Sequence, residues 1–273
     1  MLAQRVATAL VLLPLLLALV WYAPTSGLYG VLALVGLLMA WEWTGLMGWA
    51  AKARRWAYTV VCGLLLALAW LVPGRDALLP WLLAAAVLWW IYAVSLFRGF
   101  PGNLGKQQTS GLPMALLGLL LTVSTLLSLA YLHGLPGGVW KLGYSLFIVF
   151  IADTGAYFAG RAFGRHKLAP NISPGKTVEG AAGGLLATAV WALTAGVHVF
   201  KAEGAQVALL LGLTLVVAVA SIIGDLTESM FKRVAGIKDS GNILPGHGGI
   251  LDRVDSILAA APVMVLGLYL TGL

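Results

Sequence analysis

Nine long apolar stretches constrain what this chain can fold into more than any other feature. They cover residues 6–22, 28–49, 57–73, 77–97, 111–133, 142–160, 178–200, 205–230 and 250–272. Each is close to the roughly 20 residues that an α-helix needs to cross the hydrocarbon core of a bilayer. The stretches are continuously apolar instead of alternating, which favours helices over a β-barrel. We therefore predict an all-α polytopic integral membrane protein with about nine transmembrane helices.

The composition excludes a water-soluble fold. Only 10% of the residues are charged and 60% are hydrophobic, whereas soluble domains carry about 25% charged residues. The net charge is +7, and its basic residues lie between the apolar stretches. Basic residues in that position set membrane orientation and attract anions. We expect the lipid bilayer and anionic substrates as partners, and no nucleic acid.

The basic residues also predict the orientation. All but three of the 17 Lys and Arg residues lie at the N-terminus or in alternate loops; the exceptions are Arg75, Lys141 and Lys201. Cytoplasmic loops are enriched in Lys and Arg, so we predict a cytoplasmic N-terminus and an external C-terminus. The first stretch follows Arg5 and lacks a clear cleavage site of small residues after it, which predicts an uncleaved signal anchor.

The acidic residues divide the chain in two, because most of the ten lie in the second half. We predict that residues 1–140 form a transmembrane scaffold and residues 141–273 a catalytic region within one membrane domain. Glu42, between Trp41 and Trp43, is unusual in the first half because its carboxyl group lies within an apolar stretch. A protonated or interfacial glutamate is the favoured interpretation there, and a functional role stays open.

Asp153 lies within the apolar stretch 142–160. A carboxylate at membrane depth costs about 3 kcal/mol or more, so it needs a cation, a partner or a function. We favour a role in binding substrate or metal. An ion pair with Arg161 is the alternative.

A basic loop precedes the stretch that begins at residue 178. Ser173, Lys176 and Thr177 lie where this loop opens into a helix, and free backbone N–H groups beside a lysine suit a phosphate. A Walker A site is excluded, since the upstream glycine is missing and we expect no strand before the loop. The alternative is a basic cytoplasmic loop that caps a helix well.

The densest group of charges lies between residues 224 and 255. Asp225 and Glu228 are three residues apart, and Asp252 and Asp255 repeat that spacing, so each pair shares a helix face. Glycines and Pro245 interrupt the helix between the two pairs, which lets the chain fold back and bring Asp225 and Asp252 together.

Carboxylate oxygens suit Mg²⁺, whose coordination is usually completed by substrate phosphates and water. The basic side chains nearby suit the remaining phosphate charge; they are Lys232, Arg233, Lys238, His247 and Arg253. This combination predicts phosphoryl or nucleotidyl transfer. Interhelical salt bridges without catalysis are the alternative.

At these residues the sequence resembles a known family. The pattern is Ser229-x-x-Lys232-Arg233, Lys238-Asp239 and Pro245-x-His247-Gly248-Gly249-x-x-Asp252-Arg253-x-Asp255. It is similar to the signature of the phosphatidate cytidylyltransferases, also called CDP-diacylglycerol synthases. The segments Asp153–Tyr157 and Ser173–Thr177 are similar to further motifs of that family.

The resemblance implies that CTP and phosphatidate are converted to CDP-diacylglycerol and pyrophosphate, in phospholipid biosynthesis. It also implies the cytoplasmic face of a bacterial cytoplasmic (inner) membrane, a homodimer, Mg²⁺ dependence and scope for a second, monovalent cation such as K⁺. Asp225 and Asp252 match the family's metal-binding aspartates, and Asp255 is a further ligand or orients them. Catalytic roles are expected for Asp225, Asp252, Lys232 and Arg253. Substrate-binding roles are expected for Asp153, Ser173, Lys176, Thr177, Arg233, Lys238, His247, Gly248 and Gly249.

Two other classes of function stay open. Another CTP-using membrane enzyme, such as a polyprenol kinase or a synthase for an ether-lipid analogue, would need similar groups. A cation-coupled transporter would also place carboxylates between helices, but its charges would lie near the bilayer midplane in two symmetric halves. Here the charges gather at one face of one half.

Overall fold

The computed structural model describes residues 14–243 and 248–273, and eight of its helices are long and apolar enough to cross a membrane. The spans of the first half are α2 (Thr25–Leu46), α3 (Lys52–Leu71), α4 (Arg75–Gly99) and α6 (Leu112–Gly134). Those of the second half are α7 (Gly138–Phe163), α8 with its continuation (Val178–Phe200), α10 (Ala205–Ala235) and α11 (Leu251–Thr271). A short helix, α5 (Lys106–Thr109), connects α4 to α6.

These helices confirm the predicted all-α membrane architecture. Eight of the nine predicted stretches coincide with them to within a few residues. The stretch 6–22 lies largely outside the described residues, and its remainder, 14–22, is helical. Glycines mark some of the ends, since Gly137 precedes α7 and Gly236 follows α10 with φ values of +70° and +74°. Glycine adopts this left-handed conformation without the strain of a side chain.

One span is not a simple α-helix. After α8 (Val178–Trp191) the chain makes a π-helical turn, η1 (Ala192–Gly196), and a last turn, α9 (Val197–Phe200). At Gly196 a Cβ atom would lie 2.7 Å from the hydroxyl oxygen of Tyr144 on α7. The wider turn therefore passes close to an aromatic ring, where a larger side chain would not fit.

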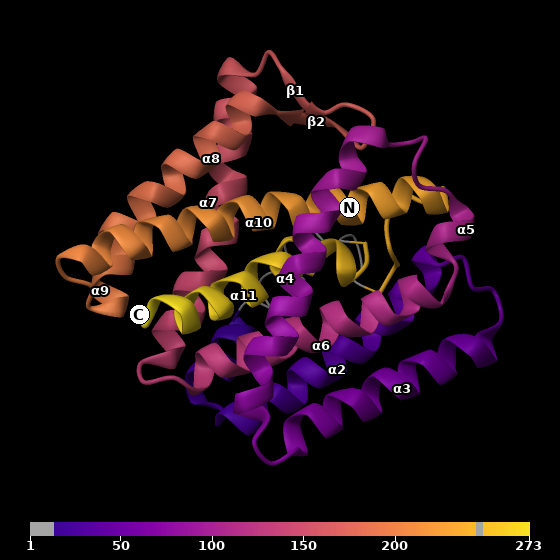
Figure 1. Ribbon diagram of the computed structural model, residues 1–273, viewed down its shortest axis with the longest axis horizontal. Coiled ribbons are helices and arrows are strands. Elements are labelled where there is room, and N and C mark those ends of the chain that lie inside the picture. The colour runs from indigo at the N-terminus through magenta and orange to yellow at the C-terminus, as the bar shows by residue number, and fades with distance from the viewer. Residues whose placement is uncertain (1–13, 244–247) are drawn as a thin grey trace.

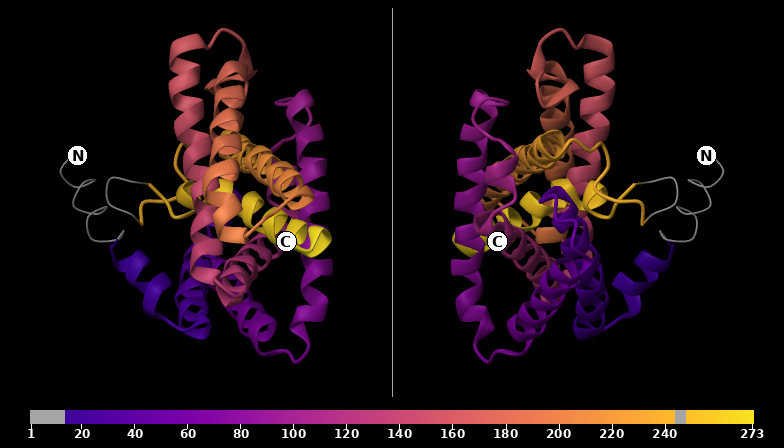
Figure 2. Two further views of the ribbon diagram at one scale, coloured as in Figure 1. Left: turned by 90° about the vertical axis from the view of Figure 1, so that its left-hand side faces the viewer. Right: turned by 90° about the vertical axis from the view of Figure 1, so that its right-hand side faces the viewer.

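Helices α10 and α11 lie in the middle of the molecule, with other helices around them. In Figure 1, α10 and α11 run side by side through the middle of the molecule, with α2, α3 and α6 below them. Figure 2 shows α7 and α8 side by side on one flank of α10, and α4 on the other flank. Helix α6 is the most enclosed span, since 72% of its most apolar 18 residues are buried. In α3 only 22% of the corresponding residues are buried, and apolar side chains such as Leu64 and Leu68 are exposed.

The loop before α8 differs from the prediction. Residues Lys167–Ala169 (β1) and Ser173–Thr177 (β2) pair as a short antiparallel hairpin, with Lys167 opposite Thr177. The expectation of no strand before the motif is therefore wrong. Local backbone pairing overrides the weak strand propensity of Pro174 and Gly175. The predicted helix start is confirmed, because the Thr177 side chain accepts a hydrogen bond of 3.1 Å from the Gly180 N–H.

The hairpin stands at one end of α7 and α8, where these two helices pack closely (Figure 1). A Cβ atom on Gly184 would lie 2.5 Å from the carbonyl oxygen of Ala152, so the two backbones touch at this point. Small residues allow such close contact between membrane helices. The contact fixes Asp153, the next residue on α7, relative to the hairpin.

We predict that Gly184→Ala lowers the free energy of unfolding by about 1–3 kcal/mol, because the added methyl group meets backbone that has no room to move. The matched control is Gly212→Ala on α10, where a Cβ atom meets nothing within 4 Å. Thermal unfolding of both purified variants in detergent tests this. Equal midpoints for the two variants would contradict the packing described here.

Candidate active site

A cavity of about 360 Å³ lies between α7, the hairpin, the start of α8 and α10. Helix α7 contributes Asp153, Tyr157 and Arg161 to its wall, and the hairpin contributes Lys176. Gly175, which also lines the cavity, is exposed and leaves its backbone accessible. The cavity therefore combines basic groups with exposed backbone, as a phosphate site requires.

Lys176 in the cavity wall forms an ion pair that joins the hairpin to α10. The Lys176 Nζ lies 2.6 Å from Asp225 Oδ2, and each side chain is about a quarter exposed, at 26% and 27%. The other carboxylate oxygen, Asp225 Oδ1, accepts a hydrogen bond of 3.2 Å from Ser229 Oγ. Because both partners keep some exposure, an incoming anion or cation can reach them.

Two more carboxylates surround the same lysine. Asp153 on α7 and Asp255 on α11 each interact electrostatically with both Lys176 and Asp225. The three acidic residues are thus brought from three helices to one ammonium group. The sequence pointed to Asp153, Lys176 and Asp225 separately, but it did not predict that these three residues meet.

A second charged cluster lies on the same α10–α11 contact and is more enclosed. Lys232 Nζ lies 2.5 Å from Glu228 Oε2 and 2.7 Å from Asp252 Oδ1. The side chains of Lys232, Glu228 and Asp252 are only 14%, 3% and 8% exposed. One ammonium group therefore neutralises two buried carboxylates.

Asp252 also holds the segment that leads into α11. Its Oδ2 accepts hydrogen bonds from the Ser240 N–H (2.9 Å) and the Gly249 N–H (2.8 Å). Gly248 has a φ of +80°, and a Cβ atom there would lie 2.9 Å from the same oxygen. The glycine is needed because the chain passes directly over the carboxylate.

Folding back brings the predicted aspartates to one interface, but they occupy two neighbouring clusters. Gly224 packs against the backbone of Asp255, with its Cβ position 3.2 Å from the Ser256 Cα, so Asp225 lies at the level of Asp255. Asp252 lies at the level of Lys232.

The remaining predicted site residues are more peripheral. Ser173 is half-buried in β2, and Thr177 caps α8. Arg233 is exposed and its Nε donates to the Ile172 carbonyl (3.3 Å), which ties the hairpin to α10. Lys238 is exposed beyond α10, and Arg253 is exposed in the first turn of α11. His247 lies outside the described residues.

The donor set suits a hard divalent cation. Asp225 already binds one cation, the Lys176 ammonium group, and Asp255 interacts electrostatically with both of them. Carboxylate oxygens are ligands that Mg²⁺ prefers. Asp225 is a more accessible candidate ligand than Asp252, since their side chains are 27% and 8% exposed. Among the described residues, no group of three His, Cys, Asp or Glu side chains is already arranged at metal-binding distances.

Sequence reasoning missed two members of the site. Glu228 was noted only for its spacing from Asp225, yet it is a buried partner of Lys232. Glu42 lies in the predicted scaffold and contacts the segment before α11. The sequence did show an unusual carboxylate inside an apolar stretch. The residues that Glu42 contacts, however, lie about 200 positions away in the sequence.

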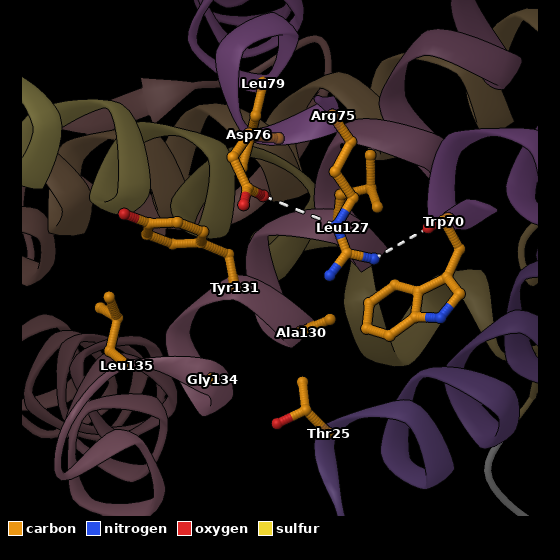
Figure 3. Close-up of a pocket in the computed structure, with 10 residues that line it drawn as sticks. All are labelled: Thr25, Trp70, Arg75, Asp76, Leu79, Leu127, Ala130, Tyr131, Gly134 and Leu135. Carbon is orange, nitrogen blue, oxygen red and sulfur yellow. Dashed lines mark hydrogen bonds and ion pairs between the residues drawn. The ribbon is translucent and has the colours of Figure 1, made fainter. Parts of the chain in front are cut away.

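A smaller cavity of about 180 Å³ lies among the ends of α3, α4 and α6 (Figure 3). Its charges are already satisfied within the protein. Arg75 pairs with Asp76 at 3.5 Å, donates to the Trp70 carbonyl at 3.0 Å and lies over the Trp70 ring. This cavity therefore carries no catalytic arrangement comparable to that around Lys176.

The chain is similar to known proteins over its whole length. The profile of the cytidylyltransferase family matches residues 3–271 of the chain. The chain belongs to this family. Phosphatidate cytidylyltransferase of Pseudomonas aeruginosa is 41% identical over 272 residues, which cover 100% of the chain and 98% of that relative. The Haemophilus influenzae protein of the same name is 38% identical over 287 residues, covering 96% of each. The Staphylococcus aureus protein of that name is 47% identical over 127 residues, or 46% of the chain.

We predict that Lys232→Met strongly destabilises this cytidylyltransferase, because it leaves two buried carboxylates without a counter-charge. Removing one partner of a buried ion pair typically costs about 3–5 kcal/mol. Thermal unfolding in detergent measures the loss, with the exposed Lys52→Met as the matched control.

Adding Glu228→Gln to Lys232→Met removes one of the two uncompensated charges and is expected to restore part of the stability. Lys232→Met at wild-type stability would contradict the contacts described here.

Proposed function

We propose that this chain transfers the cytidylyl group of CTP to phosphatidate, forming CDP-diacylglycerol and pyrophosphate. The observation that carries the proposal is the Lys176–Asp225 pair, whose lysine lines a cavity together with Arg161 and Asp153. The family assignment supports the same reaction, because full-length relatives are named phosphatidate cytidylyltransferase.

The surroundings of the cavity suit a lipid substrate. Tyr157 lines the cavity and is 59% exposed, and its neighbour Phe158 is 64% exposed. Val178, at the start of α8, is also exposed. Apolar groups on the outer surface of a membrane helix face acyl chains. A phosphatidate molecule can therefore keep its tails in the bilayer while its phosphate reaches Lys176 and Arg161.

The reaction requires little acid–base chemistry from the protein. The phosphomonoester of phosphatidate is already anionic at neutral pH, and one of its oxygens attacks the α-phosphorus of CTP. The bond between that phosphorus and the bridging oxygen of pyrophosphate breaks, and pyrophosphate leaves with the electron pair. Lys176 and Arg161 neutralise and orient the phosphates. Lys238 and Arg253 are exposed and add positive charge for the nucleotide.

We infer Mg²⁺ as the cofactor, with Asp225, Asp252 and Asp255 as its ligands or their support. When bound, the ion would offset negative charge on the phosphates and on the leaving pyrophosphate. Asp225 is the ligand that pairs with Lys176 of the cavity wall, and Asp252 holds Lys232 and the segment before α11 in place. A second, monovalent ion such as K⁺ belongs to the same proposal.

The proposal also includes the orientation of the chain in the membrane and its oligomeric state. Residues 141–273 carry the catalytic groups and residues 1–140 the scaffold, in the inner membrane of a bacterium. The N-terminus and the active site face the cytoplasm and the C-terminus lies outside. The distribution of Lys and Arg supports this orientation. The active form is a homodimer.

A label-transfer assay tests the reaction. Purified protein in detergent is given phosphatidate, Mg²⁺ and CTP labelled in the cytidine, and label is followed into the organic phase with and without a chelator. Transfer that the chelator abolishes supports the proposal, whereas the absence of transfer contradicts it. A parallel reaction with γ-labelled CTP and a polyprenol identifies a lipid kinase instead.

We predict that Asp225→Asn lowers the turnover number by about 10²–10³-fold, the scale of losing one preorganised electrostatic group. Folding and membrane insertion should persist, because Lys176 and Asp225 are both partly exposed. The matched control is Asp76→Asn, an exposed aspartate in the other cavity. A wild-type rate from Asp225→Asn would contradict the proposed role.

The orientation predicts opposite accessibility for two positions. In a Cys62→Ala background, Lys201→Cys should react with a membrane-impermeant maleimide in intact cells, and Lys167→Cys should react only after permeabilisation. Both lysines are exposed, and Cys62 is the only cysteine in the sequence. The reverse pattern of labelling would contradict the orientation.

A further inference from the structure

Glu42 makes a set of contacts that the proposed reaction does not yet use. It lies near the end of α2 with 2% of its surface exposed. Its Oε1 accepts a hydrogen bond from the Ile250 N–H (3.0 Å). Its Oε2 accepts from the Leu251 N–H (2.8 Å) and from Ser240 Oγ (3.0 Å). A residue of the predicted scaffold therefore binds the segment that carries the family motif.

These contacts cap the start of α11 from another helix. Helix α11 begins at Leu251 and has no side-chain cap from its own N-cap residue, Ile250. The Glu42 carboxylate accepts from the two N–H groups at this end instead. A negative charge at a helix N-terminus is stabilising, and it satisfies N–H groups that have no partner within the helix.

Glu42 and Asp252 together fix both ends of the segment between α10 and α11. Ser240 donates its backbone N–H to Asp252 and its hydroxyl to Glu42. At the other end Gly249 donates to Asp252, while Ile250 and Leu251 donate to Glu42. The two carboxylates therefore hold residue 240 beside residues 249–251.

The space around Glu42 is shaped for this carboxylate. A Cβ atom on Gly241 would lie 2.8 Å from the Glu42 Cδ, and one on Gly249 would lie 2.6 Å from Glu42 Oε2. Both glycines thus let backbone approach the charged group directly. The interpretation of Glu42 as an interfacial glutamate does not account for this enclosure.

We propose that Glu42 is a positioning residue for the reaction. By fixing the first turn of α11, it sets the place of Asp252 and, through Asp252, that of the Lys232 ammonium group. The inference rests on the proposed function, since it assigns Glu42 a part in that reaction without contact with substrate.

Glutamine is the most informative substitution, because it keeps the size of the side chain. Donors face both carboxylate oxygens, so either orientation of an amide would turn its NH₂ group toward at least one backbone N–H. Glu42→Gln should therefore weaken the hold on Ile250 and Leu251 while filling the same space.

The experiment compares wild type, Glu42→Gln and Asp76→Asn, another acid-to-amide change, as folded protein purified by size exclusion. We expect Glu42→Gln to lower kcat about 10–100-fold, the scale seen when a supporting residue of a metal or catalytic group is lost. KM for CTP and phosphatidate should stay within about threefold, since substrate contacts remain. Backbone amide exchange in residues 248–252 should become faster, and that in α6 should not.

A kcat of folded Glu42→Gln within about twofold of wild type would overturn the proposal, whatever its melting temperature, because a purely structural role changes the amount of folded enzyme only. If Glu42→Gln yields no folded protein, the kcat of Ser240→Ala tests the proposal instead. This substitution removes one of the three hydrogen bonds that described residues donate to Glu42 and keeps the backbone bond to Asp252. We expect kcat to fall about 3–10-fold, and an unchanged kcat overturns the proposal.

Amide exchange separates this inference from the proposed function. Wild type without label transfer, combined with faster exchange at residues 248–252 in Glu42→Gln, rejects the proposed reaction and supports the anchoring role. Unchanged exchange in that variant overturns the anchoring role, whether or not the wild type transfers label.

Discussion

The contact between α10 and α11 holds together the charged groups on which the site depends. These helices meet along a face where Asp225, Glu228 and Lys232 of α10 lie beside Asp252 and Asp255 of α11. Isolated charges of this kind would be costly in a membrane protein, so each needs a partner. Lys232 serves both Glu228 and Asp252, and Lys176 reaches Asp225 from the hairpin. The ion pairs that lower the cost of burying these charges also bring acidic and basic groups together in one place.

The Lys176 and Lys232 clusters differ in solvent accessibility, which suggests that they have different roles in the site. The Lys232 cluster is buried and fixes α10, α11 and the segment between them. The Lys176 cluster is partly exposed and borders the cavity. A rigid cluster beside an accessible one suits a reaction in which positioning of phosphates carries most of the catalysis. Glu42 extends the rigid part into the first half of the chain.

Much of this arrangement could be predicted from the sequence, because membrane spans and short motifs are local signals. The spans followed from apolar length, and the start of α8 followed from Thr177 before a helical stretch. The return of α11 onto α10 followed from glycines and proline between two charged helices. Glu228 and Glu42 were not predicted as site residues, since their roles depend on partners set by tertiary packing. The pairing of Lys176 with Asp225 joins residues 49 positions apart, and no local pattern specifies it. The hairpin was missed because backbone pairing, which side-chain pattern does not show, determines it.

The central claim is that the partly exposed Lys176–Asp225 cluster receives the phosphates of both substrates, CTP and phosphatidate. Calorimetric titration of CTP with Mg²⁺ into detergent-purified protein tests it most directly, with Lys176→Gln compared with wild type and with the exposed Lys52→Gln. The account predicts at least about tenfold weaker binding for Lys176→Gln, the scale of one lost hydrogen bond between charged groups, and unchanged binding for Lys52→Gln. Equal affinity in wild type and Lys176→Gln would contradict it.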